Sequence, residues 1–288
     1  MCRPIRMKMS LQSTWIEKIQ TLPVLPQVAM RVAERMKSPT ATIEEISNLI
    51  RSDVGLTGKV LRLANSSYYS IPGGVSDVQK ALQFLGFNTI AQLVLTSSVF
   101  GAFKSQGSRE FPLSSFWSHS FAVGLLSELT ARNFQLPNPS DCFVGGLMHD
   151  TGKLILMELA PEQLSKVVHH SRENKMSFID AEKSLNFTTH VELGTALASY
   201  WKLPSNVVAI IEHHHDDEAK TIESKIVAWA NVWVQTRNIG HSGNYLADLE
   251  AVEAELSHTL GINDQQKQKT AEFFMKEFEK AGAILNGG

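Results

Sequence analysis

Residues 141–159 read DCFVGGLMHDTGKLILMEL, and this stretch decides the fold class. Apolar residues recur along it at helical spacing, and one stripe comprises Phe143, Leu147, Asp150 and Leu154. The sequence therefore predicts one helix from Asp141 to Leu159, with Asp150 on its buried face. A buried carboxylate is costly unless another group compensates it. The stretch thus predicts a core helix in which the Asp150 carboxylate is compensated by another group.

The rest of the chain predicts further helices joined by short polar turns. Thr42 and Glu45 have the spacing of a capping box, so a helix is expected to begin after Thr42. Asp53 is predicted to cap the next helix, and Ile71-Pro72-Gly73-Gly74 is a loop. Other helices are predicted at residues 28–36, 78–84, 89–103, 115–134, 161–174, 178–185, 191–202, 204–215, 222–238, 246–258 and 266–284. Because no segment alternates as a strand does, the predicted fold class is all-α.

Composition indicates an ordinary folded protein. Of the 288 residues, 43% are hydrophobic and 19% are charged, and the formal net charge is -2. No run of Lys or Arg stands out, so no nucleic-acid partner is predicted. Two cysteines, Cys2 and Cys142, cannot form a disulfide framework, and the N-terminus lacks a signal peptide's apolar region. Residues 81–103 are uncharged but too polar for a lipid-facing span, so no membrane association and a cytoplasmic location are expected.

Several of the ten histidines fall on apolar helix stripes. These are His119, His190, His214 and His215. Taken singly, a histidine on such a face is usually a hydrogen-bonded core residue, and the run at residues 213–215 also fits an exposed tract. Taken together with Asp150, they also fit a divalent metal site, since imidazoles and a carboxylate suit Zn, Fe, Mn or Ni without choosing among them. The pattern alone leaves both interpretations open.

Other catalytic patterns are absent from the sequence, which contains no HExxH, no GxSxG and no phosphate-binding glycine loop. Gly145-Gly146 is expected to permit close helix packing. Cys142 lies near the His149-Asp150 pair without a positioned base, so it is predicted to be a small buried residue. Lys153, one turn after Asp150, fits either an exposed helix position or a phosphate contact.

Eight motifs, in order between Leu22 and Asn231, resemble the HDOD domain family. The N-terminal four are LPVLP at 22–26, RSDVGLT at 51–57, LRLANSSYY at 61–69 and ALQFLG at 81–86. The C-terminal four are FWSHS at 116–120, GGLMHDTGK at 145–153, HVELG at 190–194 and IEHHH at 211–215. The resemblance implies an all-α HDOD domain at residues 15–240. Its N-terminal helical lobe (15–110) packs on a core like that of HD phosphohydrolases (111–240), and a helical extension (241–288) follows.

The resemblance also implies a ligand set for one or two divalent transition metal ions, with a metal-free site as the alternative. Its members are His119, the paired His149 and Asp150, the downstream His190, and the His214-His215 pair, with His213 the alternative if the register shifts by one. The last ligand of the HD pattern is an Asp, and Asn231 stands at the matching position. The GYP segment of the related cyclic-di-GMP phosphodiesterases is absent after His215. An amide is a weaker ligand than a carboxylate.

The function implied is a bacterial signal-transduction module that does not hydrolyse a substrate and acts through protein partners. The alternative is a metal-dependent phosphohydrolase that takes a nucleotide or cyclic dinucleotide. In that alternative, Lys153 would contact a phosphate and the metal would generate a hydroxide.

Overall fold

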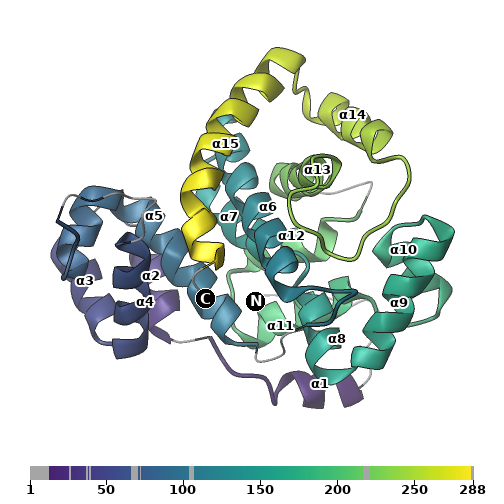
Figure 1. The fold of residues 1–288 in the computed structure, drawn as a ribbon, viewed down its shortest axis with the longest axis horizontal. Helices are drawn as coiled ribbons and strands as arrows, with labels where there is room; N and C mark the ends of the chain where they lie inside the picture. The colour runs from purple at the N-terminus through teal and green to yellow at the C-terminus, as the bar shows by residue number, and fades with distance from the viewer. Residues whose placement is uncertain are drawn as a thin grey trace, which may run out of the picture.

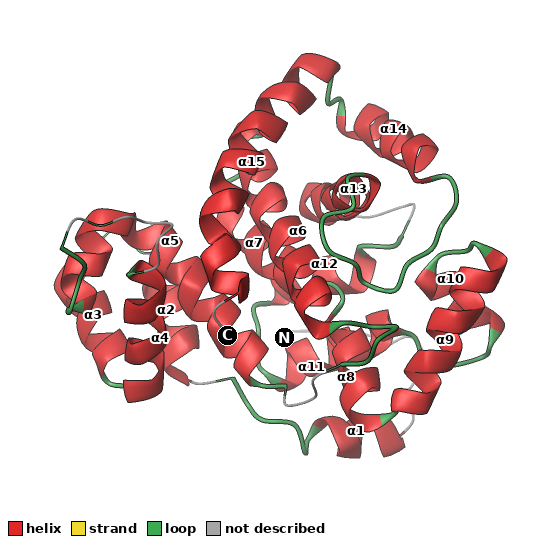
Figure 2. Cartoon of the chain, in the orientation of Figure 1, coloured by secondary structure: helices red, strands yellow, loops and turns green. Residues whose placement is uncertain are grey.

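The computed structural model describes residues 13–25, 27–36, 38, 40–65, 71, 73–103, 107–216 and 221–286 (Figure 1). Cys2, Pro26, Pro72, residues 66–69 and Lys104 lie outside the described residues. Within the described ranges every named element is a helix, and the only β pairing is an isolated bridge between Gly107 and Pro112 (Figure 2). The prediction of an all-α fold is therefore confirmed.

The N-terminal helices form a group of their own, at the left of Figure 1. They are α2 (Gln27–Met36), α3 (Ile43–Arg51), α4 (Val54–Ala64) and α5 (Val78–Gly101), and α1 (Ser13–Ile19) lies apart against α11. The capping box of Thr42 and Glu45 is present, and Asp53 Oδ1 accepts a hydrogen bond from the backbone N–H of Leu56 at 2.9 Å. Both caps predicted from the sequence are thus confirmed.

Helix α5 contains the break predicted between residues 84 and 89. Gly86 has φ 79° and ψ 166°, a conformation that glycine adopts without the steric cost of a side chain. No single helix among the described residues is long and apolar enough to cross a membrane, although the two bent halves of α5 meet the length and hydropathy criteria together.

The second group of helices builds the centre of the molecule. It contains α6 (Leu113–Asn133), α7 (Pro139–Met148), α8 (Thr151–Leu159), α9 (Pro161–Asn174), α10 (Phe178–Ser184), α11 (His190–Tyr200), α12 (Ser205–His213) and α13 (Ile222–Thr236). Helix α6 is the central element and contacts α7, α13 and the last helix, α15 (Asp264–Asn286). Helix α14 (Leu249–Leu260) covers α13. The domain boundaries at residues 15, 110 and 240 stay predictions.

The prediction of one continuous helix from Asp141 to Leu159 is wrong. Helix α7 ends at Met148 and α8 begins at Thr151, with Asp150 at φ -101° and ψ 7° between them. The stripe of buried residues nevertheless continues across the break, because the turn keeps the same side of the chain against the core. The break places His149 and Asp150 at a helix junction.

Glycines allow the helices around this junction to approach closely. A Cβ added to Gly146 would lie 2.8 Å from the Cα of Gly124 on α6, and one added to Gly145 would lie 2.5 Å from Ile210 Cγ2 on α12. A Cβ on Gly152 would lie only 1.8 Å from the carbonyl oxygen of His190. The packing role predicted for Gly145-Gly146 is therefore confirmed, and Gly152 brings α8 against the start of α11.

Candidate metal centre

The structure brings all six predicted ligands together from separate elements. They are His119 of α6, His149 and Asp150 of the α7–α8 junction, His190 at the start of α11, and His214 and His215 just after α12. Ligand atoms of Asp150, His190, His214 and His215 lie within 4.8 Å of one another, as do those of His119, His149 and Asp150. Asp150 is common to both groups. The convergence predicted from the helix stripes is present.

Asp150 lies at the middle of the cluster, and its two oxygens face different neighbours. Oδ2 is 3.2 Å from Nε2 of His149, and Oδ1 is 3.2 Å from Nε2 of His190 and 3.9 Å from Nε2 of His214. Exposed fractions are 1% for Asp150 and no more than 2% for these three histidines. His215 is partly exposed, and it is the only one of the six that is not buried.

Three imidazoles are oriented by hydrogen bonds on the side away from Asp150. Nδ1 of His149 donates to the carbonyl of Gly146, and Nδ1 of His214 donates to that of Ile211, both at 2.7 Å. Nδ1 of His190 donates to Glu182 Oε2, also at 2.7 Å. A neutral imidazole that donates from Nδ1 has its lone pair on Nε2. In the neutral form of each ring, Nε2 is therefore available as an acceptor or a metal ligand.

Those Nε2 atoms have no hydrogen-bond partner among the described residues. The same holds for both ring nitrogens of His119, for Nε2 of His215 and for Asp150 Oδ1. Buried polar atoms are normally hydrogen-bonded, so a group of unpaired polar atoms in one place requires an explanation. A divalent transition metal would satisfy them together, because imidazole nitrogen and carboxylate oxygen are ordinary ligands for such ions. The residues present fit a metal.

Lys153 belongs to the cluster and is not an exposed helix residue, so that interpretation of the sequence is wrong. It is 2% exposed. Its ammonium nitrogen donates to Asp150 Oδ2 at 2.7 Å and to the carbonyl of Ser242 at 3.0 Å, and it lies 4.5 Å from the ring centre of Phe178. The phosphate contact proposed for Lys153 stays a prediction.

One side of the cluster is closed by residues 239–245, here called the covering segment. The backbone N–H of His241 donates to the carbonyl of Ser115 at 3.1 Å, and a Cβ on Gly240 would lie 2.4 Å from the backbone nitrogen of His119. The Ser242 carbonyl accepts from Lys153. The covering segment therefore binds both to the helix that carries His119 and to the lysine of the cluster.

Burial and neighbouring charges shift the pKa values of the cluster. Burial, reinforced by the nearby His149, lowers the pKa of His119 to about 3. Burial alone would raise the pKa of Asp150, but His149 and Lys153 hold it well below its usual value. Burial disfavours protonated His190, yet the charge of Glu182 and the carboxylate of Asp150, 3.2 Å from Nε2, raise its pKa overall. Neutral His119 and ionised Asp150 are the forms that bind a cation.

Asn231, at the position where the HD pattern has its last Asp, is 4% exposed. Its Oδ1 accepts a hydrogen bond from Gln235, whose own Oε1 accepts from Asn244 of the covering segment. The Asn244 Oδ1 in turn accepts from the backbone N–H of Phe178. The side-chain carbonyl oxygen of Asn231 therefore already has a hydrogen-bond donor. Asn231 is the first residue of a hydrogen-bonded chain of neutral amides.

Two residues of the centre were missed in the sequence. Glu182 is fully buried, and it accepts from both the backbone N–H and the Nδ1–H of His190. Its position four residues after the buried Phe178 could have revealed it, because an acid on an apolar helix stripe is unusual. Ser242 follows no helical pattern, so the sequence carries no comparable signal for it.

Fold and site together define a helical protein with a buried histidine/aspartate centre at a helix junction. The HDOD domain model matches residues 22–217, about two thirds of the chain. The chain belongs to the HDOD domain family.

Solved structures agree with this assignment. An HDOD domain protein of unknown function from Geobacter sulfurreducens is 28% identical, with a TM-score of 0.74 over 95% of this chain and 98% of that one. A candidate phosphohydrolase from Shewanella amazonensis is 22% identical, with a TM-score of 0.72 over 94% and 98%. The latter shares the fold.

A curated relative is longer than this chain. An uncharacterized protein of Treponema pallidum is 24% identical over 234 residues, which is 78% of this chain but 44% of the relative. The chain thus spans less than half the length of that protein.

Proposed function

We infer that this chain is a regulatory HDOD module whose histidine/aspartate cluster binds a divalent transition metal as part of its scaffold and does not hydrolyse a substrate. The observation that carries this inference is the burial of the cluster. Asp150 and its nearest histidines are at most 2% exposed, and Lys153 and the covering segment close the site on one side. A catalytic metal site keeps a coordination position open to water and substrate.

The charges at the site support the same inference. Lys153 already neutralises one oxygen of Asp150, and Asn231 supplies an amide where the HD pattern has a carboxylate. Both features reduce the negative charge available to hold two divalent ions. A bound cation would satisfy the unpaired imidazole nitrogens and would lend Lewis acidity to any oxygen that reached it.

A module of this kind is expected to act through its outer surface on protein partners of a signalling pathway. The folded helical shell would then be the recognition element, and the centre would stabilise it. This proposal follows the family's role as a signalling or regulatory module. The identity of the metal, among Fe, Mn, Zn and Ni, and the presence of one ion or two also stay proposals.

The second candidate is a metal-dependent phosphohydrolase acting on a nucleotide or cyclic dinucleotide. The specific observation in its favour is that two groups of ligand atoms share Asp150, an arrangement that suits two neighbouring ions. Hydrolysis would require the covering segment to move, because Lys153 can contact a phosphate only after it leaves Ser242.

The test measures metal content and turnover on one preparation of the full chain, purified without chelator. We expect at least one equivalent of transition metal by elemental analysis, and no turnover of bis(p-nitrophenyl) phosphate or cyclic di-GMP after loading with Mn, Fe, Zn or Ni. Asp150→Ala and His119→Gln should lose metal. His169→Ala should keep it, since the His169 side chain is 61% exposed and pairs with Glu173.

Two results would contradict the proposal in different ways. Turnover that disappears in Asp150→Ala and persists in His169→Ala would establish the hydrolase instead. A wild-type protein that contains no metal, and takes up none, would leave the cluster as a set of core histidines and would end both metal-based functions.

A further inference from the structure

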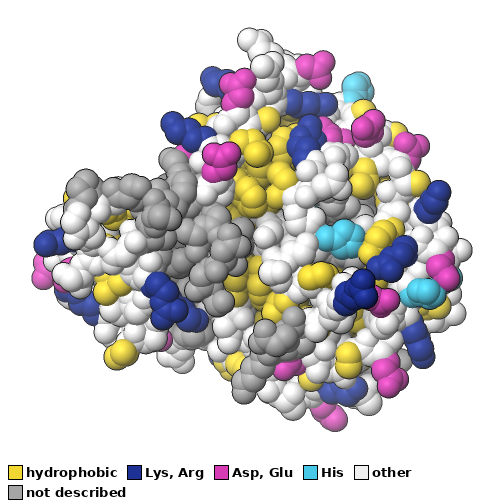
Figure 3. Space-filling view, viewed as in Figure 1, with side chains coloured by type: hydrophobic (Ala, Val, Ile, Leu, Met, Phe, Trp, Pro, Cys, Tyr) yellow, Lys and Arg dark blue, Asp and Glu magenta, His cyan; other side chains and the backbone are white. Residues whose placement is uncertain are grey.

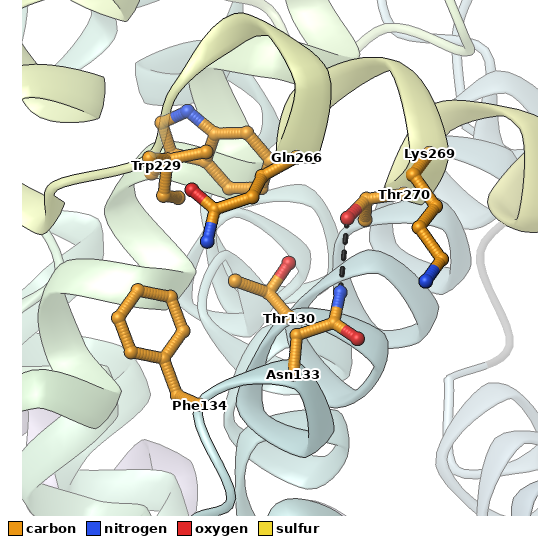
Figure 4. Close-up of a pocket in the computed structure, with 8 residues that line it drawn as sticks. Thr130, Asn133, Phe134, Trp229, Gln266, Lys269 and Thr270 are labelled. Atoms are coloured by element: carbon orange, nitrogen blue, oxygen red, sulfur yellow. Dashed lines mark hydrogen bonds between the residues drawn. The ribbon is translucent and has the colours of Figure 1, made fainter.

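A cavity of about 250 Å³ lies between the C-terminal end of α6, helix α13 and the beginning of α15, away from the metal centre. Figure 4 shows the side chains around it. The residues that line it are Thr130, Asn133, Phe134, Trp229, Ile262, Gln266, Lys269 and Thr270. Gln266, Lys269 and Thr270 lie on α15. This helix follows residues 22–217, which match the family, so the C-terminal region outside that match completes the cavity.

Two side chains on α15 present hydrogen-bond donors to the cavity. Gln266 Oε1 accepts from the backbone N–H of Asn263 at 3.0 Å, which fixes the carbonyl end of this amide and leaves its NH2 group for the cavity (Figure 4). Thr270 Oγ1 accepts from Asn133 Nδ2 at 3.0 Å, so the hydroxyl proton of Thr270 is free to be donated. Both groups can therefore bind an acceptor.

Thr130 supplies a third donor, from the opposite wall. Its residue is 3% exposed, and Oγ1 has no hydrogen-bond partner among the described residues. Figure 4 shows this hydroxyl directed from α6 toward α15. An unpaired buried hydroxyl destabilises the protein relative to a paired one, and an acceptor bound in the cavity would remove that cost.

The charge at the cavity is positive. Lys269 extends along its edge, and among the described residues no carboxylate lies within ion-pair distance of its ammonium group. None of the eight lining residues is acidic. A neighbouring depression of about 470 Å³ shares Asn133, Lys269 and Thr270 and adds Lys276 and one acid, Glu272, together with Arg132, whose charge is already paired with Glu128. An anion is therefore favoured over a neutral or cationic ligand.

The remaining wall is apolar and partly aromatic. Trp229 is 1% exposed, and its indole N–H donates to Ser257 at 2.9 Å, which fixes the ring. Phe134 and Ile262 complete this wall. In Figure 3, hydrophobic side chains gather on the surface between α15 and α13, with Lys and Arg side chains beside them. A concave apolar wall with a few convergent polar groups is typical of small-molecule sites.

We propose that this cavity binds a small organic anion in which a carboxylate or phosphate group is attached to a planar apolar body. The anionic group faces Lys269, Gln266, Thr270 and Thr130, and the planar body packs against Phe134 and Trp229. Ligand binding would stabilise the packing of α15 against α6 and α13. The site needs neither the metal nor any hydrolytic activity.

The test titrates the full chain with benzoate and, separately, with phenyl phosphate, followed by tryptophan fluorescence and by saturation-transfer NMR. At least one probe should bind saturably, and which one binds identifies the anionic group. Lys269→Met and Thr130→Val should each weaken binding at least tenfold. Lys267→Met is the matched control, because Lys267 is on the same helix, near Asp264, and does not line the cavity.

Circular dichroism verifies that each variant is folded. Because Lys269→Met changes an exposed side chain, it should fold and remains informative if Thr130→Val does not fold. Metal content should be the same in all variants, which separates this site from the metal centre. The proposal is overturned if neither probe binds saturably, or if binding is equally strong in Lys269→Met, Thr130→Val and Lys267→Met.

Discussion

Lys153→Met is the sharpest test of how the buried centre is held together. The substitution keeps an unbranched apolar side chain of similar length in place and removes only the charge. The ammonium nitrogen is 2.7 Å from Asp150 Oδ2, 3.0 Å from the Ser242 carbonyl and 4.5 Å from the centre of the Phe178 ring. With both ionic partners at most 2% exposed, loss of the lysine would leave Asp150 as an uncompensated buried charge.

Breaking a buried ion pair in this way costs about 3–5 kcal/mol. The Ser242 carbonyl would lose a donor as well, which adds about 1–3 kcal/mol if water does not replace it. We therefore expect the metal-free variant to lose at least about 3 kcal/mol of unfolding free energy. Bound metal should restore part of that loss, because the cation would supply a positive charge next to Asp150.

The measurement is urea unfolding followed by circular dichroism, in EDTA and again with metal. Lys166→Met is the matched control, since Lys166 is exposed on α9, and its stability should stay within about 0.5 kcal/mol of wild type. A Lys153→Met protein as stable as Lys166→Met in EDTA would refute the reasoning. It would mean that Asp150 is compensated by another group or is not ionised.

Three further predictions concern single residues. Gly152→Ala should cost about 3 kcal/mol in urea unfolding, the upper end of the usual overpacking cost, because its Cβ would meet the His190 carbonyl at 1.8 Å, whereas Gly58→Ala on α4, with no atom within 4 Å, should be neutral or stabilising. Glu182→Gln should weaken metal binding by about 10–100-fold in a chelator competition, while the exposed Glu162→Gln should not; equal affinities would show that Glu182 does not orient His190. Burial raises the pKa of Cys142 to about 12, so in Cys2→Ser protein at pH 8 only about one thiol in ten thousand is ionised and Ellman's reagent should react only after denaturation. Rapid reaction of the native protein would place Cys142 at the surface.

Periodicity of apolar residues predicted the helices well, because most of them bury one face. The helix predicted at 161–174 is α9 as observed, and Thr42 and Asp53 cap the helices that they were expected to cap. The failure at residues 141–159 has a clear physical reason. A stripe reports which side of the chain faces the core, and that side stays inward through the turn at His149 and Asp150, so the pattern contains no mark of the break.

The candidate site was predictable where apolar periodicity turned its residues inward, and His119, Asp150 and His190 all lie in the observed cluster. Lys153 was misjudged because a lone lysine on a helix is usually exposed. Its spacing of three residues from the buried Asp150 was the better signal, since i and i+3 residues of a helix share a face. Ser242 could not be predicted, because the covering segment is irregular and its place is fixed by contacts with α6, α8 and α10 that are distant in sequence.

The charges of the centre favour a bound cation. Asp150 and Glu182 bring two negative charges into the core, and Lys153 offsets one of them. With the imidazoles neutral, one negative charge remains among them, and a buried charge of that kind is unfavourable until a metal ion, or a proton on His190, offsets it. An Asp in place of Asn231 would add another negative charge and strengthen the demand for a second ion. The amide at this position, already bound to Gln235, adds no such charge.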